Sequence, residues 1–259
     1  MAGFVSWPIW VIVALCFLLG AVPPVIIGWL VYRSPIKSFF QKAIGVEGAL
    51  IGSVAILFGL FAAFLANDIW SRNLIAQNAV VHEADAIRTL ARYTEGMAAE
   101  QNELMRKALT DYIQTVIEKD WPKMAEGGRS TELLAKVRTI STFIISGEIG
   151  KAAGPTVQGK MIDAFTAMRE SRQARVQLAE NRKLTIKWYS LLVFGLLTQV
   201  SIAIVHVNRP RPVVFAQAIF GVALAACVAI LITNEFPFSP LNPISSEPLR
   251  TAMESLSRK

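Results

Sequence analysis

Four long apolar stretches constrain this chain more than any other feature. They cover Pro8–Val31, Gly48–Ile69, Trp188–Val207 and Val213–Thr233. Each has about the 20 residues that a helix needs to cross a hydrocarbon core of about 30 Å. Because the stretches form two close pairs with a long charged region between them, the sequence predicts a membrane protein with four spanning helices and one aqueous domain.

The charged residues support this division. Only 17% of the residues are charged, whereas soluble domains carry about 25%. The deficit lies in the apolar stretches, because acidic and basic residues are interspersed over 70–187. We attribute the net charge of +7 to the flanks of the membrane helices and expect no nucleic-acid binding. Cys16 and Cys227 lie in apolar stretches, so no disulfide framework is expected.

The aqueous region has helical periodicity. Apolar positions over 70–93 continue the pattern of the second span, so the two are predicted to form one long rod. Further helices are predicted over 98–121, where Pro122 and Gly127-Gly128 end the pattern, and over 132–146 and 157–187. The last of these could continue into the third span. A loop is expected at Gly147, Gly150, Gly154 and Pro155. Pro23-Pro24 predicts a kink or break in the first span.

These patterns predict an all-α membrane protein with a helical-bundle aqueous domain inserted between transmembrane helices 2 and 3. Residues 1–69 would hold the first two transmembrane helices, 70–187 the aqueous domain, 188–235 the third and fourth transmembrane helices, and 236–259 a Pro-rich segment with a short helix over 248–256. We expect a multi-pass protein of the bacterial inner membrane. Basic residues flank the spans on both sides, so the positive-inside rule leaves the side of the aqueous domain open.

The second span has two contrasting faces when residues are placed 100° apart. One face contains only small residues, which let another helix backbone approach closely, and we interpret it as a helix-packing seam. The seam consists of Gly45, Gly48, Gly52, Ala55, Gly59, Ala62 and Ala66. The opposite face is bulky and ends in a carboxylate. It consists of Val46, Leu50, Ser53, Leu57, Phe61, Phe64 and Asp68.

The bulky face has two interpretations. It could contact lipid while the small face packs inside one subunit. Alternatively, Leu57, Phe61 and Phe64 could line the axis of a symmetric oligomer as a hydrophobic neck that gates by dewetting. Asp68 and Glu47 would then flank the neck as charged rings. Ionisable residues near membrane depth are candidates for function.

Several short motifs follow one another along the chain. They are Leu57–Leu65 with Trp70-Ser71-Arg72, Val81-His82-Glu83-Ala84-Asp85-Ala86, Tyr112 with Glu118-Lys119-Asp120-Trp121-Pro122, Phe236-Pro237-Phe238-Ser239-Pro240, and Ser246-Glu247-Pro248. In order and spacing they resemble the bestrophin-like family of bacterial and plant membrane proteins, over nearly the whole chain from Gly45. The resemblance implies a bestrophin-like fold. Bestrophins are pentameric anion channels with four membrane helices and a helical cytosolic domain, and their second membrane helix forms a hydrophobic neck.

The same resemblance does not predict calcium gating. Only Glu235 and Glu247 lie near the Pro-Phe-rich segment, so the acidic cluster that bestrophins use for calcium is missing. His82 and Asp85 could pair, but two ligands do not make a metal site. The sequence has no catalytic triad, phosphate-binding loop or dinucleotide fingerprint. We therefore expect no enzyme, no cofactor and no metal.

Two functions from different classes remain. The first is a homo-oligomeric ion channel with its neck on the second transmembrane helix. The second is a membrane-anchored sensor or scaffold whose helical domain binds a protein partner. A small-solute transporter is disfavoured because no inverted repeat is seen. The expected partners are the lipid bilayer, further copies of the chain (a pentamer by resemblance) and monovalent ions.

Overall fold

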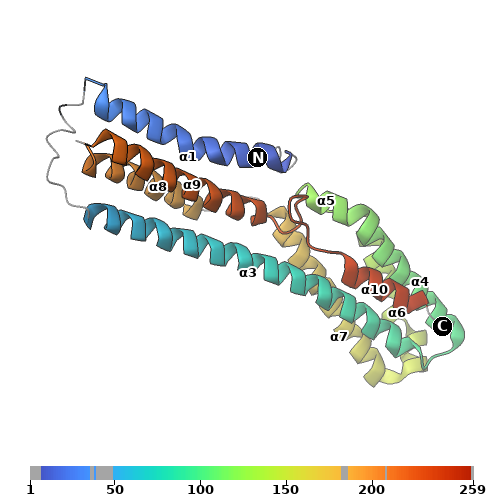
Figure 1. Cartoon of the computed structure of the whole chain (residues 1–259). Helices are drawn as coiled ribbons and strands as arrows, with labels where there is room; N and C mark the ends of the chain where they lie inside the picture. The colour runs from blue at the N-terminus through green and yellow to red at the C-terminus, as the bar shows by residue number, and fades with distance from the viewer. Residues whose placement is uncertain (1–6, 36–37, 39–48, 182–185, 208, 258–259) are drawn as a thin grey trace. The chain divides into compact units, whose positions relative to one another are not determined.

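The computed structural model describes residues 7–35, 38, 49–181, 186–207 and 209–257. These residues form helices, turns and loops without a strand. The helices are α1 (Ile9–Tyr32), α3 (Ala49–Thr94), α4 (Ala99–Thr115), the π-helical turn η2 (Val116–Asp120), α5 (Trp121–Ala125), α6 (Glu132–Ile144), α7 (Gly147–Glu180), α8 (Ile186–Val205), α9 (Pro210–Asn234) and α10 (Glu247–Ser257) (Figure 1). The predicted all-helical class is confirmed.

Four of these helices are long and apolar enough to cross a membrane, namely α1, α3, α8 and α9. The four predicted spans are therefore confirmed. The predicted rod is confirmed too, because α3 runs without interruption for 46 residues from Ala49 to Thr94.

The chain divides into two compact units. The membrane unit contains the described residues within Ser6–Trp70 and Lys183–Glu235, and the aqueous unit contains those within Ser71–Arg182 and Phe236–Lys259. The C-terminal segment with α10 thus belongs to the same unit as α4, α6 and α7. Helix α3 contributes its first part to the membrane unit and its second part to the aqueous unit.

In the membrane unit, α1 packs along α9, and α8 packs against both (Figure 1). Two glycines allow the closest approach. A Cβ on Gly221 would lie 2.6 Å from the carbonyl oxygen of Gly20, and a Cβ on Gly20 would overlap the carbonyl of Gly221. Of the predicted kink or break at Pro23 and Pro24, the break does not occur, because α1 stays helical through both residues. Membrane helices tolerate proline where neighbouring helices and local adjustments satisfy the freed backbone groups.

In the aqueous unit, α4 packs against α6 and α10, and α6 packs against α7. The core is apolar and comes from all the helices of the unit, with Ile87 and Leu90 from α3, Leu109 from α4, and Met168 from α7 among its fully buried members. Burying such side chains contributes about 1.5–3 kcal/mol each. The periodic apolar positions of the sequence therefore form the core.

Three expectations about helix ends are wrong. The segment after α4 does not stop at Pro122, because the chain passes through η2 and Pro122 lies in the first turn of α5, where no N–H is needed. The expected loop at Gly147–Pro155 is helical, and only Gly154 departs, with φ of 78°. Helix α7 ends at Glu180, where Asn181 has ψ of 77°, so it does not run into the third span.

Candidate functional site

The membrane part of α3 is the least covered of the four spans. In the 18-residue window that defines each span, only 6% of the residues of α3 are buried inside the subunit, compared with 44% of those of α8. A helix in this position offers most of its surface to lipid or to other protein chains. Because few residues of this helix are buried, the exposure of the predicted small face and of the predicted bulky face can be compared residue by residue.

The small face is open within one subunit. An added Cβ at Gly52 or Gly59 would meet no atom within 4 Å. Ala55, Ala62 and Ala66 on the same face are half-buried. Gly45 and Gly48, the first two residues of the predicted seam, lie outside the described residues. Among the residues that the structure describes, no helix of the same subunit covers Gly52 and Gly59.

The bulky face is divided by its contacts with α8. Leu57 and Phe64 are exposed, with 54% of Phe64 accessible to solvent. Phe61 is half-buried and stacks on Phe194 of α8, with ring centroids 4.8 Å apart and planes at 27°. The two outer members of the predicted neck are thus uncovered, whereas the middle member is braced by α8.

Asp68 also faces α8. One of its carboxylate oxygens lies 3.2 Å from Nζ of Lys187, and both side chains are partly exposed. This pair lowers the net charge that Asp68 presents at the end of the span. Glu47, the other predicted ring residue, lies outside the described residues.

A second exposed row on α3 was not anticipated from the sequence. Ile56 and Leu60 lie four residues apart, in step with Phe64, and 71% of Ile56 is accessible. The sequence carries no signal for this row, because its exposure follows from which side of α3 meets α8 and α9. That side includes Phe58, whose ring lies 5.4 Å from that of Phe220 on α9.

A buried polar network joins three helices of the aqueous unit. Arg175 of α7 donates from Nε to Oε2 of Glu83 on α3 at 2.9 Å and from Nη2 to Oε1 at 3.2 Å. The hydroxyl of Tyr112 on α4 donates to Oε1 of Glu83 at 2.6 Å. All three residues are fully buried. Such a network stabilises the fold only because each charge has a partner.

Asp120, at the end of η2, extends the network. Its Oδ1 accepts a hydrogen bond from the backbone N–H of Ser130 at 2.8 Å. Its Oδ2 lies 3.3 Å from Nη1 of Arg175 and 3.9 Å from Nε of Arg172, but neither contact has hydrogen-bond geometry. The guanidinium of Arg175 also lies 5.3 Å from the ring centroid of Trp121. The two guanidinium groups therefore share one carboxylate oxygen.

The electrostatics of the network keep Tyr112 neutral and Arg175 charged. Burial, and secondly the adjacent Glu83, raise the pKa of Tyr112 well above its ordinary value. Burial alone would lower the pKa of Arg175, but Glu83, together with Tyr112 and Asp120, more than offsets this, and the net pKa of Arg175 is raised. Tyr112 therefore stays neutral and Arg175 stays charged around neutral pH.

The sequence motifs identified most of this network but missed its cation. Glu83, Tyr112 and Asp120 all belong to the quoted motifs. Arg175 belongs to none of these motifs. A signal was available, because Arg175 lies seven residues after the buried Met168 and so on the apolar stripe of α7.

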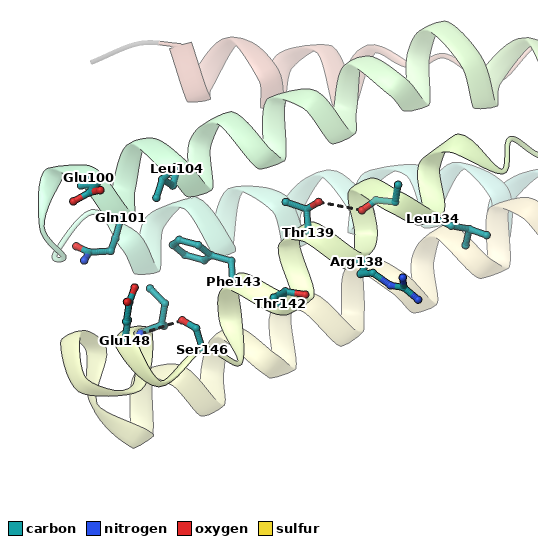
Figure 2. Close-up of a pocket in the computed structure, with 12 residues that line it drawn as sticks. Glu100, Gln101, Leu104, Leu134, Arg138, Thr139, Thr142, Phe143, Ser146 and Glu148 are labelled. Atoms are coloured by element: carbon teal, nitrogen blue, oxygen red, sulfur yellow. Dashed lines mark hydrogen bonds between the residues drawn. The ribbon is translucent and has the colours of Figure 1, made fainter.

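An open cavity of about 1170 Å³ lies between α4, α6 and the start of α7 (Figure 2). Glu100, Gln101 and Leu104 from α4 face Thr142 and Phe143 from α6 across it. Its lining mixes polar and apolar groups, with no catalytic arrangement among them. In the part of the chain that the structure describes, no three His, Cys, Asp or Glu residues are grouped to hold a metal ion. His82 itself is exposed.

Comparison with known proteins gives one family and one fold. A family profile described as a bestrophin-like domain matches residues 18–249. A crystal structure of a bacterial bestrophin homolog from Klebsiella pneumoniae is similar, with 16% sequence identity, coverage of 96% of this chain and 97% of that chain, and a TM-score of 0.64. A single-residue variant of a bestrophin homolog from the same organism aligns with 15% identity, coverage of 96% and 97%, and a TM-score of 0.68. No curated protein matches the sequence significantly.

Proposed function

Because the chain belongs to the bestrophin-like family, we propose that it is the subunit of a homo-oligomeric ion channel with a hydrophobic neck on the membrane part of α3. The observation that carries this proposal is the exposure of that helix, because only 6% of the residues in its 18-residue membrane window are buried within the subunit. The four spans make the chain a multi-pass membrane protein, and we place it in the bacterial inner membrane.

The small face supports assembly. A glycine offers lipid almost no side-chain contact, whereas it lets a second backbone come close and gain van der Waals attraction along the helix. Gly52 and Gly59 have this open surface. In our proposal they pack against a neighbouring copy, and the family resemblance favours five copies.

The bulky face supplies the neck. Leu57 and Phe64 project from the exposed side of α3, and Phe61 is held behind them by Phe194. Rings of such side chains around a narrow axis exclude water and so impose a barrier to ions. Leu60, in the neighbouring exposed row, is the alternative lining residue.

Ion selectivity depends on Asp68 in this proposal. A ring of carboxylates concentrates cations, but the pairing with Lys187 at 3.2 Å reduces that effect. We therefore leave the charge of the permeant monovalent ion unassigned. Asp68→Asn is expected to shift the cation-to-anion permeability ratio toward anions.

The test is conduction by the purified protein in planar bilayers. Phe64→Ala and Phe61→Ala should raise the current, with the larger increase from Phe64 because Phe61 is partly covered. Leu60→Ala is the matched comparison, since it shortens an exposed side chain in the neighbouring row. A larger gain from Leu60→Ala than from Leu57→Ala would move the neck to that row. Silence of the protein and of every widened variant would reject the channel.

The alternative function is a membrane-anchored scaffold whose aqueous unit binds a protein partner. The observation that favours it is the open cavity of about 1170 Å³ in that unit. A scaffold needs no axial ring of side chains. It is therefore the function that remains if the widened variants are silent while the oligomer is intact.

A further inference from the structure

A second cavity of the aqueous unit is strongly basic. It has a volume of about 620 Å³ and lies between α6 and α7. Four arginines line it, Arg129, Arg138, Arg169 and Arg172, and the only acidic residue among the lining residues that the structure describes is Glu180. Cavities of roughly 300–1,000 Å³ are the usual size for small-molecule sites. The volume and the charge together suit an anionic small molecule.

Arg172 at the wall of this cavity has unused donor capacity. Its side chain is 13% exposed, and its Nε and Nη2 atoms are buried without a hydrogen-bond partner. Its nearest acid within the described residues is Asp120, at 3.9 Å, and Arg175 lies closer to the same oxygen, at 3.3 Å. Buried donors without acceptors are costly. Arg172 therefore brings to the wall of the cavity a positive charge whose hydrogen-bonding capacity is not fully used.

The other arginines are also available to a ligand. Arg138 and Arg169 form no ion pair within the part of the chain that the structure describes, and Arg169 lies over the ring of Phe165 at 5.8 Å. Arg129 pairs with Glu180 at 3.5 Å, but both side chains are exposed. Exposed pairs of this kind contribute about 0–1 kcal/mol, so a ligand can displace the contact.

We propose that this cavity binds a small molecule that carries two or more phosphoryl groups. The planar guanidinium group matches phosphate oxygens in a bidentate way, which a halide ion cannot use. Ser141, Thr142 and Gln173 line the same cavity and add neutral donors. The site is independent of the channel proposal, because every residue that forms it belongs to the aqueous unit.

The experiment is titration calorimetry of the full-length protein in detergent with pyrophosphate as the probe. The wild type should bind about one pyrophosphate per subunit, and potassium chloride at equal ionic strength should give no saturable heat. Arg138→Gln combined with Arg169→Gln should weaken binding by about tenfold or more, because each charge-assisted hydrogen bond is worth about one to two decades of affinity. Both side chains are exposed, so the fold should survive, which the melting temperature checks.

The matched control combines Arg92→Gln with Lys151→Gln. These residues are exposed cations of the aqueous unit that do not line the cavity, and the pair removes the same net charge. Equal weakening in the control would show diffuse attraction and overturn the proposal, as would an absence of saturable binding.

A further arm identifies the source of the phosphoryl groups. The protein is placed in nanodiscs of phosphatidylglycerol or of phosphatidylcholine. Loss of pyrophosphate binding only with the anionic lipid would support the site and assign it to a lipid headgroup. Equal binding in both lipids would support the site and assign it to a soluble ligand.

Discussion

The buried pair of Glu83 and Arg175 gives the sharpest test of how the aqueous unit is held together. Glu83→Gln keeps the shape of the side chain but removes its charge, so the fully buried Arg175 loses its anionic partner and one of two hydrogen bonds, at 2.9 and 3.2 Å, because an amide has one acceptor oxygen. Removing one partner of such a pair costs about 3–5 kcal/mol. Asp120 remains 3.3 Å from Arg175, which favours the lower end of that range.

The double variant separates pairing from packing. Arg175→Met alone leaves the carboxylate of Glu83 buried with only the Tyr112 hydroxyl as partner, and it should cost a similar amount. In the combination of Glu83→Gln with Arg175→Met, no uncompensated charge remains in the pair. We therefore expect the double variant to be no less stable than either single variant, with a coupling energy of about 3 kcal/mol.

The assay is thermal unfolding of the full-length protein in detergent, followed by helical circular dichroism and by tryptophan fluorescence. Trp121, one of six tryptophans, lies against Arg175, so part of the emission change reports on the network. At roughly 2–4 °C per kcal/mol, each single variant should melt about 6–20 °C below the wild type. The control is Lys136→Gln, which breaks a pair with Asp111 at 3.1 Å whose side chains are about 40% exposed and should shift the midpoint by about 4 °C or less. Additive losses in the double variant would refute the reasoning.

Other parts of the molecule give three more tests. Tyr112→Phe should reduce the loss of stability above pH 10.0, the ordinary pKa of tyrosine. Above that pH the tyrosine ionises in the unfolded chain but stays neutral in the fold, because its pKa there is raised, so the fold loses stability as the pH rises. Melting temperatures from pH 8 to 11 compare this loss between the wild type and the variant. Gly52→Leu should reduce the oligomer seen by native mass spectrometry, whereas Gly28→Leu, at an equally open position on α1, should leave it intact. Gly20→Ala should lower the melting temperature of the subunit, because its Cβ would overlap the carbonyl of Gly221, and overpacking costs about 1–3 kcal/mol. An unchanged midpoint would contradict the close approach of α1 and α9.

The features predicted from the sequence are those that depend on long repeated patterns. The four spans and the α3 rod follow from the length and period of the apolar residues, which hold over 20 or more residues. The failures are local. The pattern predicts a loop at Gly147 and Gly150, but Ile149 between them is buried in the core and Gln158 donates to the carbonyl of Ile144 at 2.8 Å. Packing of that turn outweighs the weak helix propensity of glycine.

The candidate site could be predicted only in part. Spacing separates a small face from a bulky face on α3, but it does not say which of them α8 covers. Phe61 and Phe64 lie on the same predicted face, and yet Phe61 stacks on Phe194 while Phe64 is exposed. The contact depends on the crossing of two helices that lie far apart in the chain. A single sequence carries no direct record of that crossing.

The π-helical turn makes the aqueous unit sensitive to the number of residues in one short segment. Each hydrogen-bonded ring in η2 contains one residue more than an α turn, so everything after it is rotated by about 100° relative to an uninterrupted helix. Asp120, the last residue of η2, contacts Ser130 and Arg175 from within this turn. Deleting the exposed Lys119 would leave a more regular helix with Asp120 turned away from both. Substitutions of Lys119 should therefore cost little stability. Deleting or inserting a residue in this segment should cost much more, because it changes the helical phase of the residues that follow.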